Sequence, residues 1–324
     1  MNSFYLCFIR VFISLLFCLP GYFLAKSKKA SGNHLGTLSS ILIYACGPCM
    51  IINSFYLCAK EARANNLALG NIGLNMFYFG IFTFILQVLF MLILYLILKR
   101  KYDDPKYRVL TIGSVLGNVG FFGLPLVEAL IPNNPLVLCY SSVYIVSMNI
   151  LVFTVGVFCL TNDKSYISIR DAIINPTTLA LFVAIPAFIF ADKLNPNDFT
   201  NNIWDGIALL GKMTTPICMI IMGIRLANVN FLSLFKRPFI YIMCFLKLIV
   251  FPLFCFLLVY FLPFIDNIFK SSILILSATP CASVILNMAE IHHKEEELAA
   301  NSVLVATLLS IISIPLIILA LNLL

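Results

Sequence analysis

Residues 117–126 read GNVGFFGLPL and interrupt a hydrophobic segment near its middle. A second interruption, ATPCASVILNMA at residues 278–289, lies at the matching place in the other half of the chain. Helix ends at such breaks are polar, and a bilayer tolerates them only where they face protein or a water-filled cavity. A matched pair of interrupted hydrophobic segments is typical of the binding site of a secondary transporter.

The whole chain is apolar, with a mean hydropathy of +1.02 and with charged residues at 11% of its 324 positions. A soluble domain of this length could not bury so much apolar surface, so its solvent must be lipid. The composition therefore predicts an all-α integral membrane protein. We expect ten spanning helices, near residues 4–25, 36–58, 74–98, 108–131, 136–160, 174–191, 203–226, 237–262, 270–289 and 297–323.

The basic residues predict how these helices are oriented. Fourteen of them fall on one set of connections: Lys26, Lys28, Lys29, Lys99, Arg100, Lys101, Lys106, Arg108, Lys164, Arg170, Arg225, Lys236, Arg237 and Lys294. Four fall on the opposite set: Lys60, Arg63, Lys193 and Lys270. By the positive-inside rule the richer side is cytoplasmic, so both termini are expected to be extracytoplasmic in a multi-pass plasma membrane protein. The net charge of +7 comes largely from these anchors and indicates no nucleic-acid partner.

The two halves of the chain correspond in kind. A division near residue 165 gives five helices in 1–165 and five in 166–324, and an odd number per half forces the second to be inverted relative to the first. Pro48 and Pro216 lie inside the second and seventh segments. Pro125 and Pro280 mark the fourth and ninth. This weak internal symmetry predicts an inverted repeat.

These motifs together resemble the auxin efflux carrier family of membrane transporters. The fourth segment resembles the family's first crossover motif, because glycine and proline follow Asn118 five and seven residues on. Similar short matches cover nearly the whole chain: Asn175-Pro176, Pro216 with Gly223, Lys247 with Pro252, and residues 278–289. One position departs from the pattern. Val284 stands where many bacterial members have a polar residue, which leaves Ser283 and Asn287 as alternatives.

The resemblance implies an architecture shared with sodium/proton antiporters and bile-acid transporters. It implies ten helices in two inverted five-helix repeats, with the broken fourth and ninth helices crossing each other. Helices 1, 2, 6 and 7 would form a scaffold and the contact of a homodimer. Helices 3–5 and 8–10 would form the moving transport domain. The substrate implied is a small organic anion, either auxin-like or a dicarboxylate such as malate, moved by alternating access.

Several residues at the breaks are candidates for substrate contact. Asn118 can bind a carboxylate or hold the broken backbone in place. Gly120 and Gly123 permit close approach of a ligand, or serve helix packing through small residues. Pro125 and Pro280 are expected to be architectural, as are Pro48 and Pro216, because proline removes a backbone donor and stops a helix from continuing.

Two lysines lie about ten residues inside apolar segments, Lys212 and Lys247. A charge at such depth costs on the order of 3 kcal/mol on insertion scales and usually marks a pathway or an ion pair. Neither lysine has an Asp or Glu at matching depth, which suits an anionic substrate. The alternative is that each snorkels or bonds to the carbonyl groups of a broken helix.

The sequence fits several modes of energy coupling and either direction of transport. Sodium coupling, proton coupling and uniport driven by the membrane potential all fit, and so does a coupled carrier of another solute class. No cofactor and no metal site is expected. A non-transporting receptor is the alternative of a different class, although such a protein usually carries a soluble signalling part. A membrane enzyme is not expected, because no zinc motif, paired aspartates or nucleophile with a base is visible.

Two further patterns resemble sites of other chemistry. Cys46-Gly47-Pro48-Cys49 matches a thioredoxin-like redox motif, which requires an exposed thiol at the start of a soluble helix. Here the motif lies within an apolar helix. The residues His292, His293 and 295–297 could suggest a metal site, but carboxylates at the start of the last helix explain them better through the helix dipole.

Overall fold

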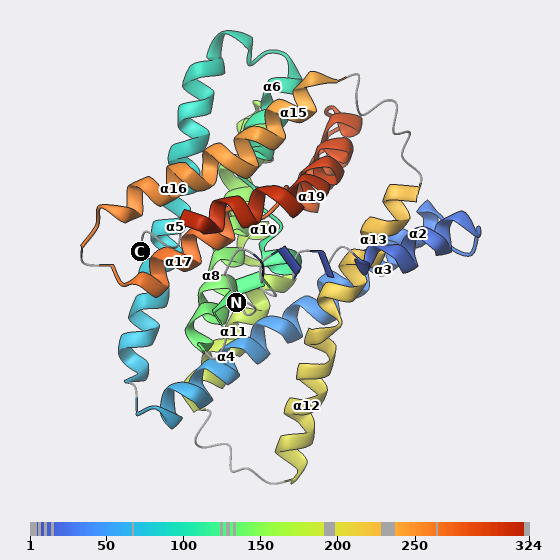
Figure 1. Ribbon diagram of the computed structural model, residues 1–324. Helices are drawn as coiled ribbons and strands as arrows, with labels where there is room; N and C mark the ends of the chain where they lie inside the picture. Colours follow the sequence, from blue (N-terminus) through green and yellow to red (C-terminus); the bar gives the residue numbers. More distant parts are fainter. Residues whose placement is uncertain are drawn as a thin grey trace.

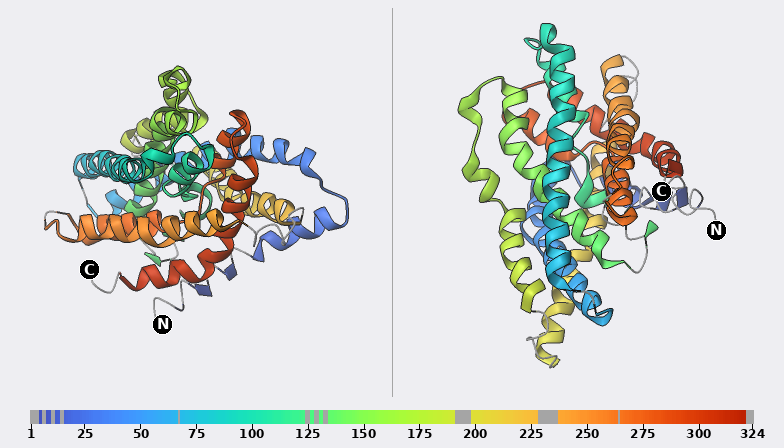
Figure 2. Two further views of the ribbon diagram at one scale, coloured as in Figure 1. Left: turned by 90° about the horizontal axis from the view of Figure 1, so that it is seen from above. Right: turned by 90° about the vertical axis from the view of Figure 1, so that its left-hand side faces the viewer.

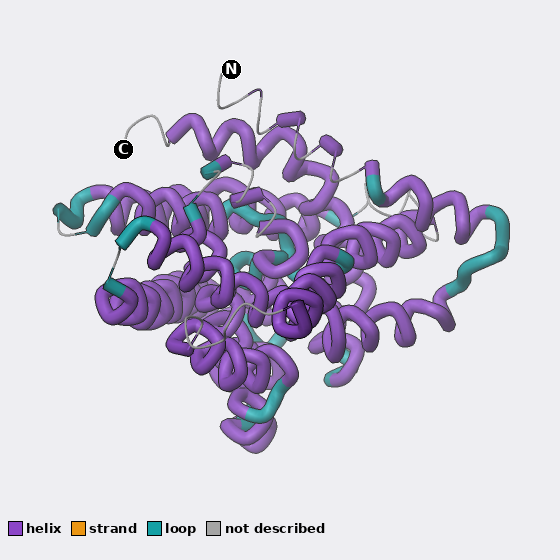
Figure 3. The backbone as a smooth tube through the Cα atoms, turned by 90° about the horizontal axis from the view of Figure 1, so that it is seen from below, coloured by secondary structure: helices purple, strands orange, loops and turns teal. Residues whose placement is uncertain are grey.

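The computed structural model describes the chain except residues 1–4, 6–7, 10–11, 14–15, 67, 124–125, 128–129, 132–133, 191–197, 228–236, 264 and 321–324; residues 33, 121, 135 and 198–200 are described for their backbone alone. Helices make up the architecture, and Figure 3 shows no strand in the described part of the chain. The predicted all-α class is therefore confirmed.

Seven helical segments among the described residues are long and apolar enough to cross a membrane. They are His34–Ala64, Leu69–Lys101, Leu136–Thr161, Lys164–Phe190, Asn201–Ala227, Pro238–Tyr260 and Glu296–Ile318. They correspond to seven of the ten predicted spans. The predicted first span lies partly outside the described residues, and the fourth and ninth are divided into shorter helices. The ten-helix inverted layout and the division at residue 165 therefore stay predictions.

Several spans are built from more than one helical element (Figure 1). The first half contains α2 (Cys18–Lys26), α3 (Gly32–Ile41), η1 (Leu42–Cys46), α4 (Gly47–Ala64), α5 (Leu69–Leu98), η2 (Lys99–Lys101), α6 (Pro105–Gly113), η3 (Val119–Gly123), α8 (Pro135–Leu151), η4 (Val152–Gly156) and α9 (Val157–Thr161). The second half contains η5 (Lys164–Tyr166), α10 (Ile169–Ile173), α11 (Pro176–Phe190), α12 (Asp198–Lys212), α13 (Thr214–Ala227), α15 (Pro238–Phe245), η6 (Leu246–Val250), α16 (Phe251–Tyr260), α17 (Asn267–Ser277), α18 (Ser283–Ile291) and α19 (Glu296–Ile318).

Three of the prolines within the spans follow irregular turns, whereas Pro186 and Pro315 lie inside the regular helices α11 and α19. The π-helical turn η1 immediately precedes α4, whose second residue is Pro48, and η6 immediately precedes α16, whose second residue is Pro252. Pro216 is the third residue of α13, which follows a turn at Met213. Proline cannot donate the hydrogen bond that a regular helix needs, and a change of helical pitch just before it accommodates the missing donor.

The helices pack in two kinds of pair. Two pairs join the halves of the chain: α2 packs against α13, and α11 packs against α4. Two other pairs each lie within one half: α5 packs against α8, and α15 packs against α19. Figure 1 shows α2 beside α13, and the right-hand view of Figure 2 shows the long helix α5 running beside α8.

The contact between α2 and α13 depends on two glycines that face the opposite backbone. A methyl group at Gly21 would overlap the carbonyl oxygen of Ile220, and one at Gly223 would overlap the carbonyl oxygen of Cys18. Lipid supplies little hydrophobic driving force between helices, so such close approach of small residues contributes much of the association. This pair of helices is therefore held by backbone proximity.

We predict that Gly223→Ala destabilises the protein by about 1–3 kcal/mol or more, in the range of overpacked cores, because the added methyl group meets backbone that cannot turn away. Gly206→Ala on α12 is the matched control, since nothing lies within 4 Å of the position of its added methyl group. It should be neutral or raise stability by up to about 1 kcal/mol through helix propensity. Thermal unfolding of both variants in detergent measures the difference, and equal midpoints would contradict the proposed packing role.

Candidate binding site at the two helix breaks

Two helices of the protein end inside the packed core and resume after a short non-helical segment. Helix α6 ends at Gly113, and the chain becomes helical again at Val119 in η3. Helix α17 ends at Ser277, and α18 begins at Ser283. The first interruption thus precedes Gly120 and Gly123 instead of coinciding with them, while Pro125 lies outside the described residues.

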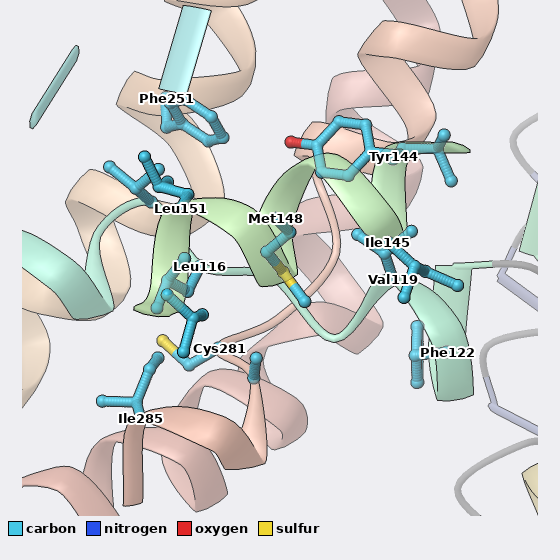
Figure 4. Packing of buried hydrophobic residues seen from close by; sticks show 14 of the residues in the cluster. Leu116, Val119, Phe122, Tyr144, Ile145, Met148, Leu151, Phe251, Cys281 and Ile285 are labelled. Atoms are coloured by element: carbon cyan, nitrogen blue, oxygen red, sulfur yellow. The ribbon is translucent and has the colours of Figure 1, made fainter. Parts of the chain in front are cut away.

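The two interruptions pair with each other through backbone hydrogen bonds. The N–H of Asn118 donates to the carbonyl oxygen of Pro280 at 2.7 Å, and the N–H of Ala282 donates to the carbonyl oxygen of Leu116 at 3.0 Å. Gly117 and Cys281 thereby form an isolated antiparallel β-bridge. Leu116 and Cys281 lie close together below Met148 and Leu151 of α8 (Figure 4). Backbone N–H and carbonyl groups that lack a partner within a helix are thus hydrogen-bonded to the other break.

The pairing shows which positions of the two breaks correspond. The same distance along the chain separates Leu116 from Pro280, Gly117 from Cys281, and Asn118 from Ala282. The counterpart of Asn118 is therefore Ala282, which has no polar side chain. Ser283 and Asn287 lie further along, one turn apart on α18, and both are partly exposed.

Asn118 has a buried side chain with an unused donor. The residue is 3% exposed, and its Nδ2 atom has no hydrogen-bond partner among the described residues. Its side chain lies beside the thiol of Cys218 on α13. Its carbonyl oxygen accepts from the N–H groups of Phe122 and Gly123 at 3.0 and 3.1 Å. That oxygen belongs to the main chain, so these two bonds leave the side-chain amide uncommitted. Since a buried amide donor without a partner is costly, the side chain keeps hydrogen-bonding capacity for a ligand.

Lys247 is fully buried in the π-helical turn η6 and reaches the same place. Its Nζ atom donates to the carbonyl oxygen of Ser277, the last residue of α17, at 2.8 Å and lies 4.7 Å from the centroid of the Phe251 ring. The ammonium group thus caps the negative end of a helix dipole. No described Asp or Glu forms a salt bridge with it.

Two glycines give the breaks their close contact. A methyl group at Gly117 would overlap the Oγ1 atom of Thr279 and lie 2.9 Å from the Nζ atom of Lys247. One at Gly123 would lie 2.9 Å from the Cγ2 atom of Thr279. Gly120 is more open, because its nearest neighbour would be the end of the Ile145 side chain at 3.2 Å. Gly117, which sequence reasoning did not single out, is the tightest of the three.

The remaining predicted residues lie in different surroundings. Lys212 is the last residue of α12, and its side chain is exposed, so the structure does not bring it to the breaks. Pro280 is buried and supplies the carbonyl oxygen that accepts from Asn118. Pro48 and Pro216 lie at the starts of α4 and α13.

The cysteine motif at residues 46–49 and the His and Glu residues at 292–297 both lie where a structural role accounts for them. Cys46 is fully buried in a continuous helical segment. His293 contacts Glu296 at 3.1 Å, and Arg237 at the start of α15 pairs with Glu297 at 2.6 Å. In the part of the chain that the structure describes, no three His, Cys, Asp or Glu side chains gather as they would around a metal ion.

A buried polar cluster between α5 and α8 escaped the sequence analysis. The Nε2 atom of Gln87 lies 3.5 Å from the Oγ atom of Ser147, and the Oγ1 atom of Thr83 lies 3.4 Å from it. All three side chains are buried. A glutamine inside an otherwise apolar helix was the available signal, since such a group must find partners within the protein.

We predict that Gly117→Ala destabilises the protein by about 1–3 kcal/mol, as overpacking does, because the methyl group would push Thr279 and Lys247 out of place. Gly120→Ala in the same segment is the control, since only a flexible side-chain end must move. Thermal unfolding in detergent compares the two. A Gly117→Ala variant as stable as Gly120→Ala would show that the breaks are not tightly packed there.

A comparison with protein families identifies the chain. A family model described as membrane transport protein, which comprises the auxin efflux carriers, matches residues 6–318, nearly the whole length. No curated protein is similar enough to match. The apolar spanning helices agree with the family assignment and place the protein in a membrane. The chain belongs to the membrane transport protein family of the auxin efflux carriers.

Proposed function

We propose that this transporter is a secondary carrier of small organic anions, which bind where the two helix breaks meet. The observation that carries the proposal is the buried ammonium group of Lys247, which has no carboxylate partner among the described residues. An isolated buried charge is unfavourable unless something compensates it. A carbonyl dipole does so in part, and a bound carboxylate would do so in full.

Two further features of the breaks favour an anion. The first N–H groups of α18 have no partner within their own helix, and the positive end of its dipole points into the break. The Nδ2 donor of Asn118, which has no partner among the described residues, lies in the same region. The opposite helix end, that of α17, carries negative carbonyl groups, but Lys247 offsets it. The balance at the breaks is positive, so a carboxylate is the ligand class we infer.

The proposed layout is two inverted five-helix repeats with crossed fourth and ninth helices. The reciprocal bonds of Asn118 and Ala282 support it, because a two-fold axis would exchange one bond for the other. The pairing of α2 with α13 and of α11 with α4 supports a scaffold of helices 1, 2, 6 and 7. We propose that this scaffold forms a homodimer in the plasma membrane, with both termini outside. The remaining helices would move the substrate by alternating access, an auxin-like anion or a dicarboxylate.

Purified protein in liposomes tests this function. We expect saturable uptake of labelled malate, malonate or indole acetate, and imposed sodium, proton or potential gradients would distinguish coupled transport from uniport. Lys247→Met should fold and lose most of this uptake, because it removes the positive charge while keeping an apolar stem of similar length. Folded wild-type protein that moves no carboxylate would contradict the proposal. A Lys247→Met variant that fails to fold would assign this lysine a structural role.

We predict that Asn118→Ala weakens substrate binding by roughly 10–100-fold, the value of a hydrogen bond to a charged group. Asn118→Asp should weaken it further, because it keeps the shape of the side chain and adds a negative charge that repels a carboxylate. The KM for uptake into liposomes measures both. If the two variants instead lose thermal stability equally and keep the wild-type KM, Asn118 serves only to hold the backbone.

A further inference from the structure

We propose that Arg225 binds the carboxylate of the substrate as it passes between the cytoplasm and the helix breaks, along a lane between α13 and α18. This inference rests on the function proposed above and adds to it an anion contact outside the breaks. By sequence alone Arg225 counts as one of the basic residues that set the orientation of the chain. Its surroundings in the structure differ from those of such an anchor.

The guanidinium group of Arg225 is partly withdrawn from the surface and incompletely bonded. Its Nε and Nη1 atoms are buried and have no hydrogen-bond partner among the described residues, although the residue as a whole is partly exposed. An arginine that only anchors a helix extends its charged end into water or headgroups. Two buried donors without partners are costly, and a carboxylate would accept a charge-assisted hydrogen bond from either of them.

The position of Arg225 on α13 connects it to the breaks. Arg225 and Cys218 are seven residues apart and so lie on the same face of the helix, roughly 10 Å apart along its axis. The thiol of Cys218 lies beside the side chain of Asn118, and α13 also packs against η3. A face of α13 therefore leads from the first break toward the side that the basic residues predict to be cytoplasmic.

A polar stripe on α18 follows the same direction. Ser283, Asn287 and Glu290 succeed one another on one face of this helix and are partly or fully exposed, whereas Ile285, Leu286, Met288 and Ala289 are buried. The stripe begins at the second break and ends at Glu290. The stripe offers an anion that leaves the break a succession of polar side chains along α18.

Glu290 lies near Arg225 but does not bond to it. The two side chains interact electrostatically, but they form no salt bridge, in contrast to Arg237 with Glu297 at 2.6 Å. Glu290 therefore does not occupy the Nε and Nη1 donors of the guanidinium group. Glu290 is the competing anion, and it would offset the charge of Arg225 whenever no substrate is bound.

The experiment measures the KM of wild-type and variant protein separately from each face, in inside-out and right-side-out membrane vesicles. The probe is whichever of labelled malate, malonate or indole acetate the wild-type protein transports. Arg225→Gln should raise the KM at the cytoplasmic face roughly 10–100-fold, as loss of a charge-assisted hydrogen bond does, and change it less than about twofold at the other face. Arg225→Lys should have a KM at the cytoplasmic face between those of the wild type and Arg225→Gln, because it keeps the charge but not the planar guanidinium group.

Two control variants separate an anion contact from a structural ion pair. Arg237→Gln removes a basic residue from the same side of the membrane and should leave the KM unchanged. Glu290→Gln should lower the KM at the cytoplasmic face, because it removes the competing anion from an exposed position where folding is not at risk. If Arg225 and Glu290 form only a structural pair, both variants lose stability alike and neither changes the KM.

The outcomes distinguish the two proposals. Wild-type protein that moves no carboxylate in either vesicle overturns the proposed function and this inference together. Wild-type protein that transports, with Arg225→Gln equal to Arg237→Gln, overturns this inference alone. Should Arg225→Gln fail to fold, Glu290→Gln decides, since an unchanged KM in that variant also overturns it.

Discussion

The structure depends on two backbone hydrogen bonds that join its two broken helices. A break in a membrane helix leaves N–H and C=O groups without partners, and lipid offers none. Here the N–H groups of Asn118 and Ala282 bond to the carbonyl oxygens of Pro280 and Leu116, so each break satisfies the other. Neither interruption would be stable alone. Pairing at this point also brings together four helix ends from both halves of the chain, and this makes the centre of the protein electrostatically distinct from the apolar helices around it.

The two breaks carry different polar side chains. In the paired bonds of the two breaks, Ala282 corresponds to Asn118. Asn118 thus supplies an amide and Lys247 an ammonium group, and the position that corresponds to Asn118 carries an alanine. Symmetric lysines would repel each other, and symmetric asparagines would leave two buried amides to satisfy. Under the proposed function, the ammonium group of Lys247 and the amide of Asn118 would contact different parts of one anion.

Close approach of backbones is the second recurring feature. Gly21 and Gly223 bring α2 against α13, and Gly117 brings the first break against Thr279 and Lys247. In lipid, packing between helices cannot rely on the exclusion of water, so contacts of this kind carry more of the stability. The irregular turns η1 and η6 have a related role, because they let prolines enter helices without breaking them and place Lys247 where it reaches the end of α17.

Hydropathy alone determined that the chain is an all-α membrane protein, and it located the seven observed spans, because twenty apolar residues in a row have few alternatives in a bilayer. The sixth predicted span begins ten residues later than the observed helical segment Lys164–Phe190. Asn118, Pro280 and Lys247 were also visible, since polar groups and prolines stand out in apolar helices. Only tertiary structure decided that the first break precedes Gly120 and that Lys212 is exposed while Lys247 is fully buried. It also showed that two donors of Arg225 have no partner in the described part of the chain. Depth along a helix can be counted from sequence, but the face that a side chain presents and the partner it meets depend on how the helices pack.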